Sequence, residues 1–359
     1  MSKWEYTETE LWRYGENGIS IYHVFGTISV KKTIFAFAEA RNGDGSDANC
    51  THDIVMRKST DGGKSFMPEV KVLPSEGKHC WVNPVPIYDP AIGRLFLFYA
   101  ENLGNTKTEN YIIYSDDLGE SWSEQRNTTD LLETHFSLPG PGHGLCLSKG
   151  EHKGRLIVQF WHRDGGVEVP SEGRDYRLSY LYSDDHGESW RHSVYYGREL
   201  FSNESRLIEC EDSILWSIRT KDKYQGVGRS YDGGDSFVEF DRCPLPEAKN
   251  CDIGAVSLRG NCKEKYKNMV IMSRVAQLEK RRDMEIRISY DGGRSFTDTF
   301  SLMPGDAMPG YSDLCVIYED EPIVGLLHCR NNHVMFSRIS LQTLTGGKYE
   351  NTSRSVWLK

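Results

Sequence analysis

The sequence lacks the features of several large protein classes. No apolar run approaches the ~18 residues that a membrane-spanning helix needs. No two cysteines have the Cys-x-x-Cys spacing, and their number is odd. The nine cysteines are Cys50, Cys80, Cys146, Cys210, Cys243, Cys251, Cys262, Cys315 and Cys329. This scatter indicates reduced, mostly buried thiols and argues against a disulfide framework or a zinc site.

An excess of positive charge is also missing. The chain has 43 Lys and Arg against 52 Asp and Glu, a formal net charge of −9. Nucleic acids and anionic membranes attract basic surfaces, so we expect neither as a partner. The first ten residues, MSKWEYTETE, lack the apolar segment of a signal peptide. This favours a cytoplasmic protein, or a secreted one whose signal peptide has been removed.

What the chain does contain is an eight-residue pattern, Ser-x-Asp-x-Gly-x-Ser-aromatic, in five copies. The copies occupy residues 59–66, 115–122, 183–190, 230–237 and 289–296. Successive copies start 47 to 68 residues apart, which fits one sheet module per repeat.

The residue types in the pattern predict a turn between two antiparallel strands. The Asp side chain accepts hydrogen bonds from backbone N–H groups just ahead of it, and the Gly tolerates a positive φ. Runs rich in strand-forming residues precede the copies, such as 111–114, 178–182 and 284–288. We therefore expect repeated β-sheet rather than helix.

The octapeptide resembles the Asp-box, or BNR repeat. Five copies at this spacing resemble the six-bladed β-propellers of the sialidase superfamily. The resemblance implies an all-β fold, a six-bladed β-propeller in one domain over residues 1–359, with the last thirty or so residues closing the ring. It also implies that the boxes lie away from the active site, so we assign them no chemistry.

The resemblance covers about Ile19 to Cys329 and implies several site residues. Residues 38–47, Ala-Glu-Ala-Arg-Asn-Gly-Asp-Gly-Ser-Asp, are similar to the family segment with a substrate-binding arginine and an acid/base carboxylate. These positions are Arg41 and Asp47. Composition alone would make Asp47 a turn residue in a Gly-rich loop and Arg41 a strand-end ion pair.

Two later segments resemble the family's Asn-Glu pair and the arginine on the following strand. Residues 202–209 and 214–219 place Glu204 and Arg219 at these positions. Glu204 is implied as the base that assists the nucleophile and Arg219 as a ligand of the substrate carboxylate. From the residues alone, Glu204 could be a surface carboxylate, and Glu209 is a second candidate.

The nucleophile and a further arginine come from the last third of the chain. Residues 310–314, Gly-Tyr-Ser-Asp-Leu, resemble the setting of the family's nucleophilic tyrosine, which implies Tyr311. Upstream, the resemblance selects Arg281 as a substrate-binding arginine. Arg282 is the alternative, because adjacent residues of a strand face opposite ways and only one can point into the site.

Two positions depart from the family. His23 stands where the family has the first arginine of its carboxylate-binding triad, and His328 stands where a supporting glutamate is expected. We expect both histidines to bind substrate, more strongly as they protonate, and to favour a sugar acid whose carboxylate is placed differently. Alternatively, another arginine such as Arg330 enters the site.

Together these residues indicate a retaining glycoside hydrolase that acts on glycans ending in sialic acid or a related acidic sugar. A neutral phenol approaches the anomeric carbon without the repulsion that the sugar carboxylate would impose on a carboxylate nucleophile. No step requires a metal or organic cofactor. The alternatives are a hydrolase or lyase of the same fold for another acidic sugar, such as a 2-keto-3-deoxy acid or a uronide, and a propeller that only binds glycans.

Overall fold

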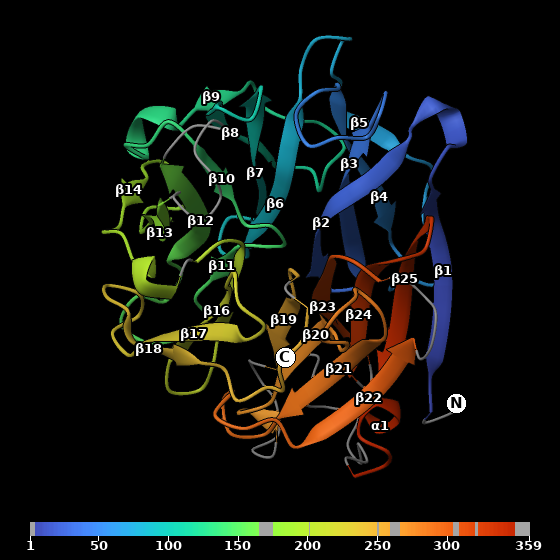
Figure 1. The fold of residues 1–359 in the computed structure, drawn as a ribbon, viewed down its shortest axis with the longest axis vertical. Helices are drawn as coiled ribbons and strands as arrows, with labels where there is room; N and C mark the ends of the chain where they lie inside the picture. The colour runs from blue at the N-terminus through green and yellow to red at the C-terminus, as the bar shows by residue number, and fades with distance from the viewer. Residues whose placement is uncertain are drawn as a thin grey trace.

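The chain folds into six antiparallel sheets arranged around a central axis (Figure 1). The computed structural model describes residues 4–164, 175–200, 202–249, 251–258, 266–303, 309–319 and 322–348. The prediction of an all-β, six-bladed propeller is therefore confirmed. Each sheet is one blade, numbered here from the first complete sheet along the chain.

In blades 1 to 5 the strands run outward from the axis in chain order. Blade 1 contains β2 (Ile21–Val30), β3 (Thr33–Arg41), β4 (His52–Ser59) and β5 (Val70–Leu73). Blade 2 contains β6 (Trp81–Asp89), β7 (Arg94–Leu103), β8 (Lys107–Ser115) and β9 (Arg126–Asn127). Blade 3 contains β10 (Ser137–Pro139), β11 (Leu145–Cys146), β12 (Leu156–Asp164), β13 (Asp175–Ser183) and β14 (Arg191–His192), with both β10 and β11 paired to β12.

Blades 4 and 5 repeat this order. Blade 4 contains β15 (Ser205–Glu209), β16 (Ile214–Arg219), β17 (Gln225–Ser230) and β18 (Val238–Arg242). Blade 5 contains β19 (Gly254–Ser257), β20 (Val270–Val275), β21 (Met284–Ser289) and β22 (Asp298–Met303). The short helices lie outside the sheets: η1 (Glu16–Gly18), η2 (Thr129–Leu131), η4 (Arg198–Leu200) and α1 (Leu341–Leu344).

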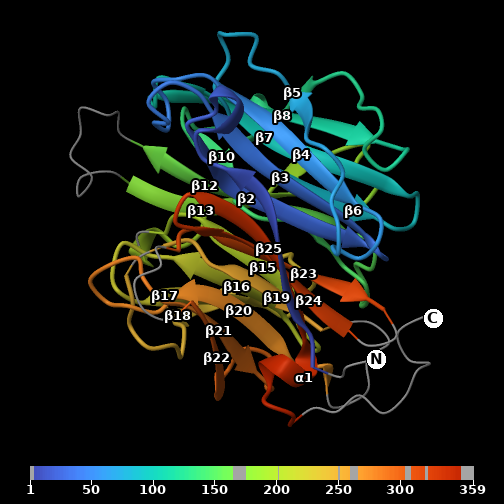
Figure 2. The same ribbon diagram turned by 90° about the vertical axis from the view of Figure 1, so that its right-hand side faces the viewer.

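Blade 6 joins the two ends of the sequence and closes the ring. It contains β23 (Ser312–Tyr318), β24 (Pro322–Arg330), β25 (His333–Ser340) and β1 (Tyr6–Arg13). Strand β1 pairs antiparallel with β25, from Tyr6 opposite Ile339 to Arg13 opposite His333 (Figure 2). Of the last thirty or so residues, which were expected to close the ring, β25 does so together with an N-terminal strand that the motifs did not reveal, and residues 349–359 lie outside the described residues.

The Asp-box turns have the hydrogen bonds that their residue types predict. In the first copy, Oδ1 of Asp61 accepts hydrogen bonds from the backbone N–H groups of Lys64 and Ser65, each at 3.0 Å. The hydroxyl of Ser59 donates to the same carboxylate at 2.8 Å. Each copy joins the third strand of a blade to the fourth. In blade 6 these strands come from opposite ends of the chain, so five boxes suffice for six blades.

Aromatic residues of the boxes pack against neighbouring blades. Trp190, at the end of the third box, is buried, and its ring centroid lies 4.9 Å from that of Phe98 in blade 2. Phe98 is itself fully buried. Burying an aromatic side chain of this kind stabilises a protein by about 2–3 kcal/mol. The repeat therefore contributes to the contacts that hold adjacent blades together.

The order of the strands separates the boxes from the other loops. In an antiparallel sheet, successive connections lie at opposite ends of the strands. The boxes share one end with the turns between first and second strands. The loops between second and third strands, and those between blades, share the other end. Asp47, Glu204, Arg281 and Tyr311 all belong to these last two kinds of loop.

Two expectations from composition also bear on the described residues. The eight cysteines among them are free, and six are buried: Cys80, Cys210, Cys243, Cys251, Cys315 and Cys329. Cys262 lies outside the described residues. Within the described ranges, no helix is long and apolar enough to cross a membrane.

Candidate active site

Tyr311 and Glu204 meet near the axis of the propeller. Tyr311 directly precedes β23 and Glu204 directly precedes β15, so both lie where the chain enters an innermost strand. The phenolic hydroxyl of Tyr311 donates a hydrogen bond to Oε1 of Glu204. Arg219, the last residue of β16, donates to Oε2 of Glu204, and its Nη1 lies 2.9 Å from the Tyr311 hydroxyl. The structure thus brings together three of the predicted residues.

The surroundings keep the Tyr311 phenol neutral. Burial and the negative charge of Glu204 raise the pKa of Tyr311 well above its ordinary value, while Arg219 opposes the rise. The carboxylate of Glu204 also holds the pKa of Arg219 well above its ordinary value against the effect of burial. Tyr311 therefore needs a base to become a nucleophile, and Glu204 already accepts its hydrogen bond.

Asp47 and Arg41 form a second cluster in blade 1. Asp47 lies in the loop between β3 and β4, and its Oδ1 accepts a hydrogen bond from Nη1 of Arg41 at 2.6 Å. The Asp47 side chain is 77 % exposed, whereas that of Arg41 is 6 % exposed. One oxygen of the carboxylate is thus bound by Arg41, while the side chain remains open to an incoming group.

Arg41 lowers the pKa of Asp47. Desolvation alone raises this pKa, but the charge and hydrogen bond of Arg41 outweigh it. Asp47 is therefore ionised at neutral pH. A carboxylate suits the role of general base directly, whereas the role of general acid requires a proton and favours acidic conditions.

His23 lies beside Tyr311, but it carries no positive charge. Its imidazole ring contacts the ring of Tyr311, with centroids 4.5 Å apart. Desolvation first, and then the positive charges of Arg41, Arg281 and Arg219, lower the pKa of His23 to about 3. His23 is neutral at ordinary pH, which corrects the expectation that its protonation strengthens substrate binding.

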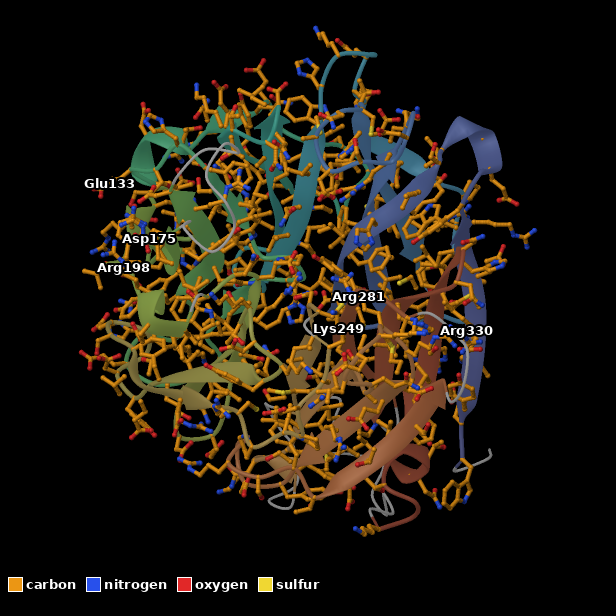
Figure 3. The ribbon with its side chains drawn as sticks, in the orientation of Figure 1. Glu133, Asp175, Arg198, Lys249, Arg281 and Arg330 are labelled. Atoms are coloured by element: carbon orange, nitrogen blue, oxygen red, sulfur yellow. The ribbon has the colours of Figure 1, made fainter. Side chains whose placement is uncertain are left out.

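Of the two neighbouring arginines, Arg281 approaches Tyr311. Its guanidinium carbon lies 5.9 Å from the centre of the Tyr311 ring, and Figure 3 shows it near the axis. Both Arg281 and Arg282 belong to the loop between β20 and β21, so strand alternation does not govern their directions.

Arg330, the alternative source of an arginine, lies at the outer side of blade 6 and binds Glu8 at 2.6 and 2.7 Å.

The structure does not bring His328 into this cluster. The fully buried ring of His328 points into blade 6, where Nε2 lies 2.9 Å from the Ser337 hydroxyl and 3.7 Å from Glu8. The adjacent Cys329 faces the other way, with its sulfur 4.0 Å from the Tyr311 carbonyl oxygen. Burial lowers the pKa of His328 to about 4, so it too is neutral. Fully buried against Ser337 and Glu8, His328 is not placed to bind substrate beside His23, which corrects that expectation.

Glu209, the alternative to Glu204, has a different setting. Its carboxylate accepts hydrogen bonds from the backbone N–H and the hydroxyl of Ser148 at 2.8 and 2.7 Å. It lines a cavity of about 580 Å³ together with His143 and Leu314, among others. None of Asp47, Glu204 and Tyr311 lines this cavity, so its size does not identify the chemical site.

Two groups of buried polar residues near the site were not predicted. Glu39 is fully buried and binds Nε of Arg41 at 2.8 Å, and desolvation raises the pKa of Glu39 to about 7. Its place two residues before Arg41, on the same strand face, is a signal that the sequence offers. Arg206 lies beneath the site, 2.6 Å from Asp252 and 3.6 Å from Asp313. No local pattern links these three, because they meet only through the ring.

The combined arrangement suits transfer of a glycosyl group at its anomeric carbon. It offers a phenol paired with a carboxylate, a second carboxylate on an open loop, and arginines that bind anions in a planar, two-pronged geometry. Within the described residues, no group of three His, Cys, Asp or Glu side chains is placed to hold a metal ion.

Comparisons with known proteins agree with the fold. The model of the BNR repeat-like domain family matches residues 32–329. The chain is 25 % identical to a sialidase of Micromonospora viridifaciens over 95 % of its length, and 24 % identical to a sialidase of Bacteroides fragilis (strain YCH46) over 92 %. Among solved structures, the Hadza microbial sialidase Hz136 superposes with a TM-score of 0.80 at 22 % identity, covering 92 % of this chain and 68 % of that one.

The match covers only part of the two curated relatives. The chain spans 55 % of the Micromonospora protein and 64 % of the Bacteroides protein.

Proposed function

Because the chain belongs to the BNR repeat-like domain family and to the sialidase superfamily, we propose that it is a retaining glycoside hydrolase. Its substrates are glycans that end in sialic acid or a related acidic sugar. The observation that carries the proposal is the hydroxyl of Tyr311, which contacts both the carboxylate of Glu204 and the guanidinium of Arg219. A buried tyrosine with a base and a cation on its oxygen is suited to nucleophilic attack.

In the first step, the oxygen of Tyr311 forms a bond to the anomeric carbon while Glu204 accepts the phenolic proton. The bond from the anomeric carbon to the leaving oxygen breaks, and protonated Asp47 gives its proton to that oxygen. The product is a covalent tyrosyl-glycoside. Arg219 stabilises negative charge that develops on the phenolic oxygen, because its Nη1 already lies 2.9 Å away.

In the second step, ionised Asp47 removes a proton from water, whose oxygen attacks the anomeric carbon. The bond to Tyr311 breaks, and the phenolate recovers its proton from Glu204. Two displacements at one carbon retain its configuration. The low pKa of Asp47 suits this second step, whereas the first step is favoured by acidic pH.

Arg281 is the proposed principal ligand of the substrate carboxylate. It forms no hydrogen bond or ion pair with a carboxylate among the described residues and lies over the ring of Tyr311. Arg219, which contacts both Glu204 and Tyr311, adds a second cation. Arg41 already binds Glu39 and Asp47 and is better placed for ring hydroxyl groups.

The test is a product assay with a panel of α-sialosides, 2-keto-3-deoxy-octulosonic acid glycosides and uronides. Mass spectrometry is expected to find the free acidic sugar, and NMR of the first product is expected to show the α-anomer. Release of an unsaturated sugar would indicate elimination instead. Binding of a substrate without any release would indicate a glycan-binding propeller.

A further inference from the structure

The acid/base candidate Asp47 lies on a loop with no regular secondary structure. Residues 42–51 join β3 to β4, and the Asp47 side chain is 77 % exposed. Most bonds to this loop come from blade 1 itself, such as the one between Nε2 of His52 and the carbonyl of Ser46 at 2.9 Å. Arg41 binds the Asp47 carboxylate from within blade 1, so the position of the loop also depends on its contacts outside blade 1.

Blade 2 supplies that contact through a single amide. Nδ2 of Asn102, near the end of β7, donates a hydrogen bond to the backbone carbonyl of Asp47 at 3.0 Å. The thiol of Cys80 lies 3.6 Å from the same carbonyl oxygen and is the weaker partner. The strong donor from outside blade 1 is thus Asn102.

The orientation of the Asn102 amide is fixed from its other side. Its Oδ1 accepts a hydrogen bond from the backbone N–H of Asn105 at 2.9 Å, which commits Nδ2 to Asp47. The Asn102 backbone N–H donates to the carbonyl of Cys80 at 2.9 Å, and the residue is only 5 % exposed. A buried amide with both ends bonded has one available geometry.

The chain of bonds continues into blade 3. The guanidinium of Arg163, on β12, donates to the carbonyl oxygen of Asn105 and lies over the ring of Phe136, 3.9 Å from its centre. Arg163, Asn105, Asn102 and Asp47 thus form one series of contacts across three blades. Such a series opposes displacement of the loop.

We propose that Asn102 is the positioning residue of the acid/base carboxylate, holding Asp47 from the neighbouring blade. The inference rests on the proposed role of Asp47 in proton transfer. Asn102 does not touch the reacting atoms. Its loss lets the loop shift, and a displacement of about 1 Å at a proton donor costs roughly 100-fold in rate. Proton donation matters most when the leaving group is poor, so the loss depends on the substrate.

The test compares Asn102→Ala with Asn110→Ala. Asn110 is a buried asparagine of β8 in the same blade, and its Nδ2 donates to the carbonyl of Ser137 at 3.1 Å without touching the loop. For Asn102→Ala we expect kcat/KM to fall about 10- to 100-fold on alkyl glycosides and less than about threefold on nitrophenyl glycosides. Asn110→Ala is expected to affect the two substrate types equally. An equal effect of Asn102→Ala on both types would overturn the proposal.

A second readout does not depend on activity. Amide hydrogen exchange in residues 42–51 is expected to become at least about tenfold faster in Asn102→Ala and to stay unchanged in Asn110→Ala. Unchanged exchange in the folded Asn102→Ala variant would overturn the positioning role, whether or not the wild type is a glycosidase. If wild type turns over no acidic glycoside while exchange responds as expected, the proposed function fails and the positioning of the loop stands.

If Asn102→Ala does not fold, the isosteric Asn102→Asp takes its place. One oxygen of the new carboxylate still accepts from Asn105, while the other faces the Asp47 carbonyl without a proton to donate. The same split between alkyl and nitrophenyl substrates is expected. Its absence would overturn the proposal.

Discussion

Nη1 of Arg219 lies 2.9 Å from the hydroxyl oxygen of Tyr311 and also donates a hydrogen bond to Glu204. One guanidinium nitrogen therefore positions both the proposed nucleophile and its base. Tyr311 and Glu204 are 107 residues apart in the sequence and belong to different blades. Their meeting at the axis depends on the closed ring, so the chemistry of the site and the stability of the ring are linked.

Replacing Tyr311 by Phe removes the nucleophilic oxygen and little else. Turnover of any acidic glycoside that the wild type cleaves is expected to fall by about 10³-fold or more. The fold remains, because the ring keeps its contacts with His23. Circular dichroism and initial rates measure both effects. Tyr99→Phe, which removes a buried hydroxyl in blade 2 away from the site, is the control and retains activity. Full activity of Tyr311→Phe would exclude a tyrosyl intermediate.

Replacing Asp47 by Asn removes proton transfer but preserves shape. The rate on alkyl glycosides is expected to fall at least about 100-fold, and the rate on glycosides with good leaving groups much less, because these leave without a proton. Steady-state kinetics on a series of leaving groups measures the difference. Equal losses across the series would show that Asp47 does not donate a proton.

Arg281→Met tests the carboxylate ligand. Losing a charge-assisted hydrogen bond of about 1.5–3 kcal/mol raises KM for an acidic sugar by roughly 10- to 100-fold. Thermal unfolding is expected to change little, because Arg281 pairs with no carboxylate among the described residues. The neighbouring Arg282→Met is the matched control and is expected to leave KM within about threefold. A larger KM effect in the control would assign the role to Arg282.

Substrate affinity is expected to be insensitive to the protonation of His23. Its pKa of about 3 lies below the working range, so the ring stays neutral from pH 5.5 to 7.5. KM for an acidic glycoside should change by less than about threefold over this range in wild type and in His23→Gln alike. A steep fall in KM with acidification that disappears in His23→Gln would contradict this result.

His328 is expected to make the fold sensitive to acid. Its pKa is about 4 in the folded protein, below the ordinary value of 6.5, so between these values the unfolded chain binds the proton that the folded protein excludes. The stability that His328 contributes is present above pH 6.5 and is lost as pH falls toward 4, at about 1.4 kcal/mol per pH unit. The charged groups beside His328 are Glu8 and Arg330, and despite burial the hydrogen bond and charge of Arg330 hold the pKa of Glu8 below its ordinary value.

Urea unfolding at several pH values tests this contribution. His328→Gln, which keeps a polar group facing Ser337, is expected to have a flatter decline of unfolding free energy between pH 6.5 and 4. If the decline in His328→Gln equals that of the wild type, another group dominates the acid sensitivity and the assignment to His328 is wrong. His333→Gln, on β25 of the same blade, is the control and is expected to preserve the wild-type slope.

The sequence predicted most of the fold because the Asp-box is a local signal. Its Asp, Gly and Ser determine a turn, and the spacing of the copies indicates the blades. Strand β1 was missed because its pairing with β25 joins residues more than 300 positions apart, which no local pattern records. Where β1 lies in the ring is therefore determined by the fold of the whole chain and not by its local sequence.

Short motifs surround Tyr311 and Asp47 and made them candidates from the sequence, and their roles stay predictions. Charge was harder to predict, because the pKa of His23 depends on burial and on three arginines, of which Arg219 and Arg281 belong to other blades. The direction in which the His328 side chain points could not be predicted either, because it depends on which face of β24 is turned toward the axis. The contact of Asn102 with the Asp47 loop crosses from one blade to the next and has no sequence signal.

The central claim is that Tyr311 forms a covalent bond with the sugar. Its most direct test is mass spectrometry of the intact and proteolysed protein after incubation with a 2,3-difluoro derivative of the sugar acid that proves to be the substrate. The fluorine at C3 slows breakdown of a covalent intermediate by destabilising positive charge at the anomeric carbon. The account predicts one added sugar on the peptide that contains Tyr311. Inactivation with the added mass on any other residue, or turnover of the reagent without an adduct in rapidly quenched samples, would contradict it.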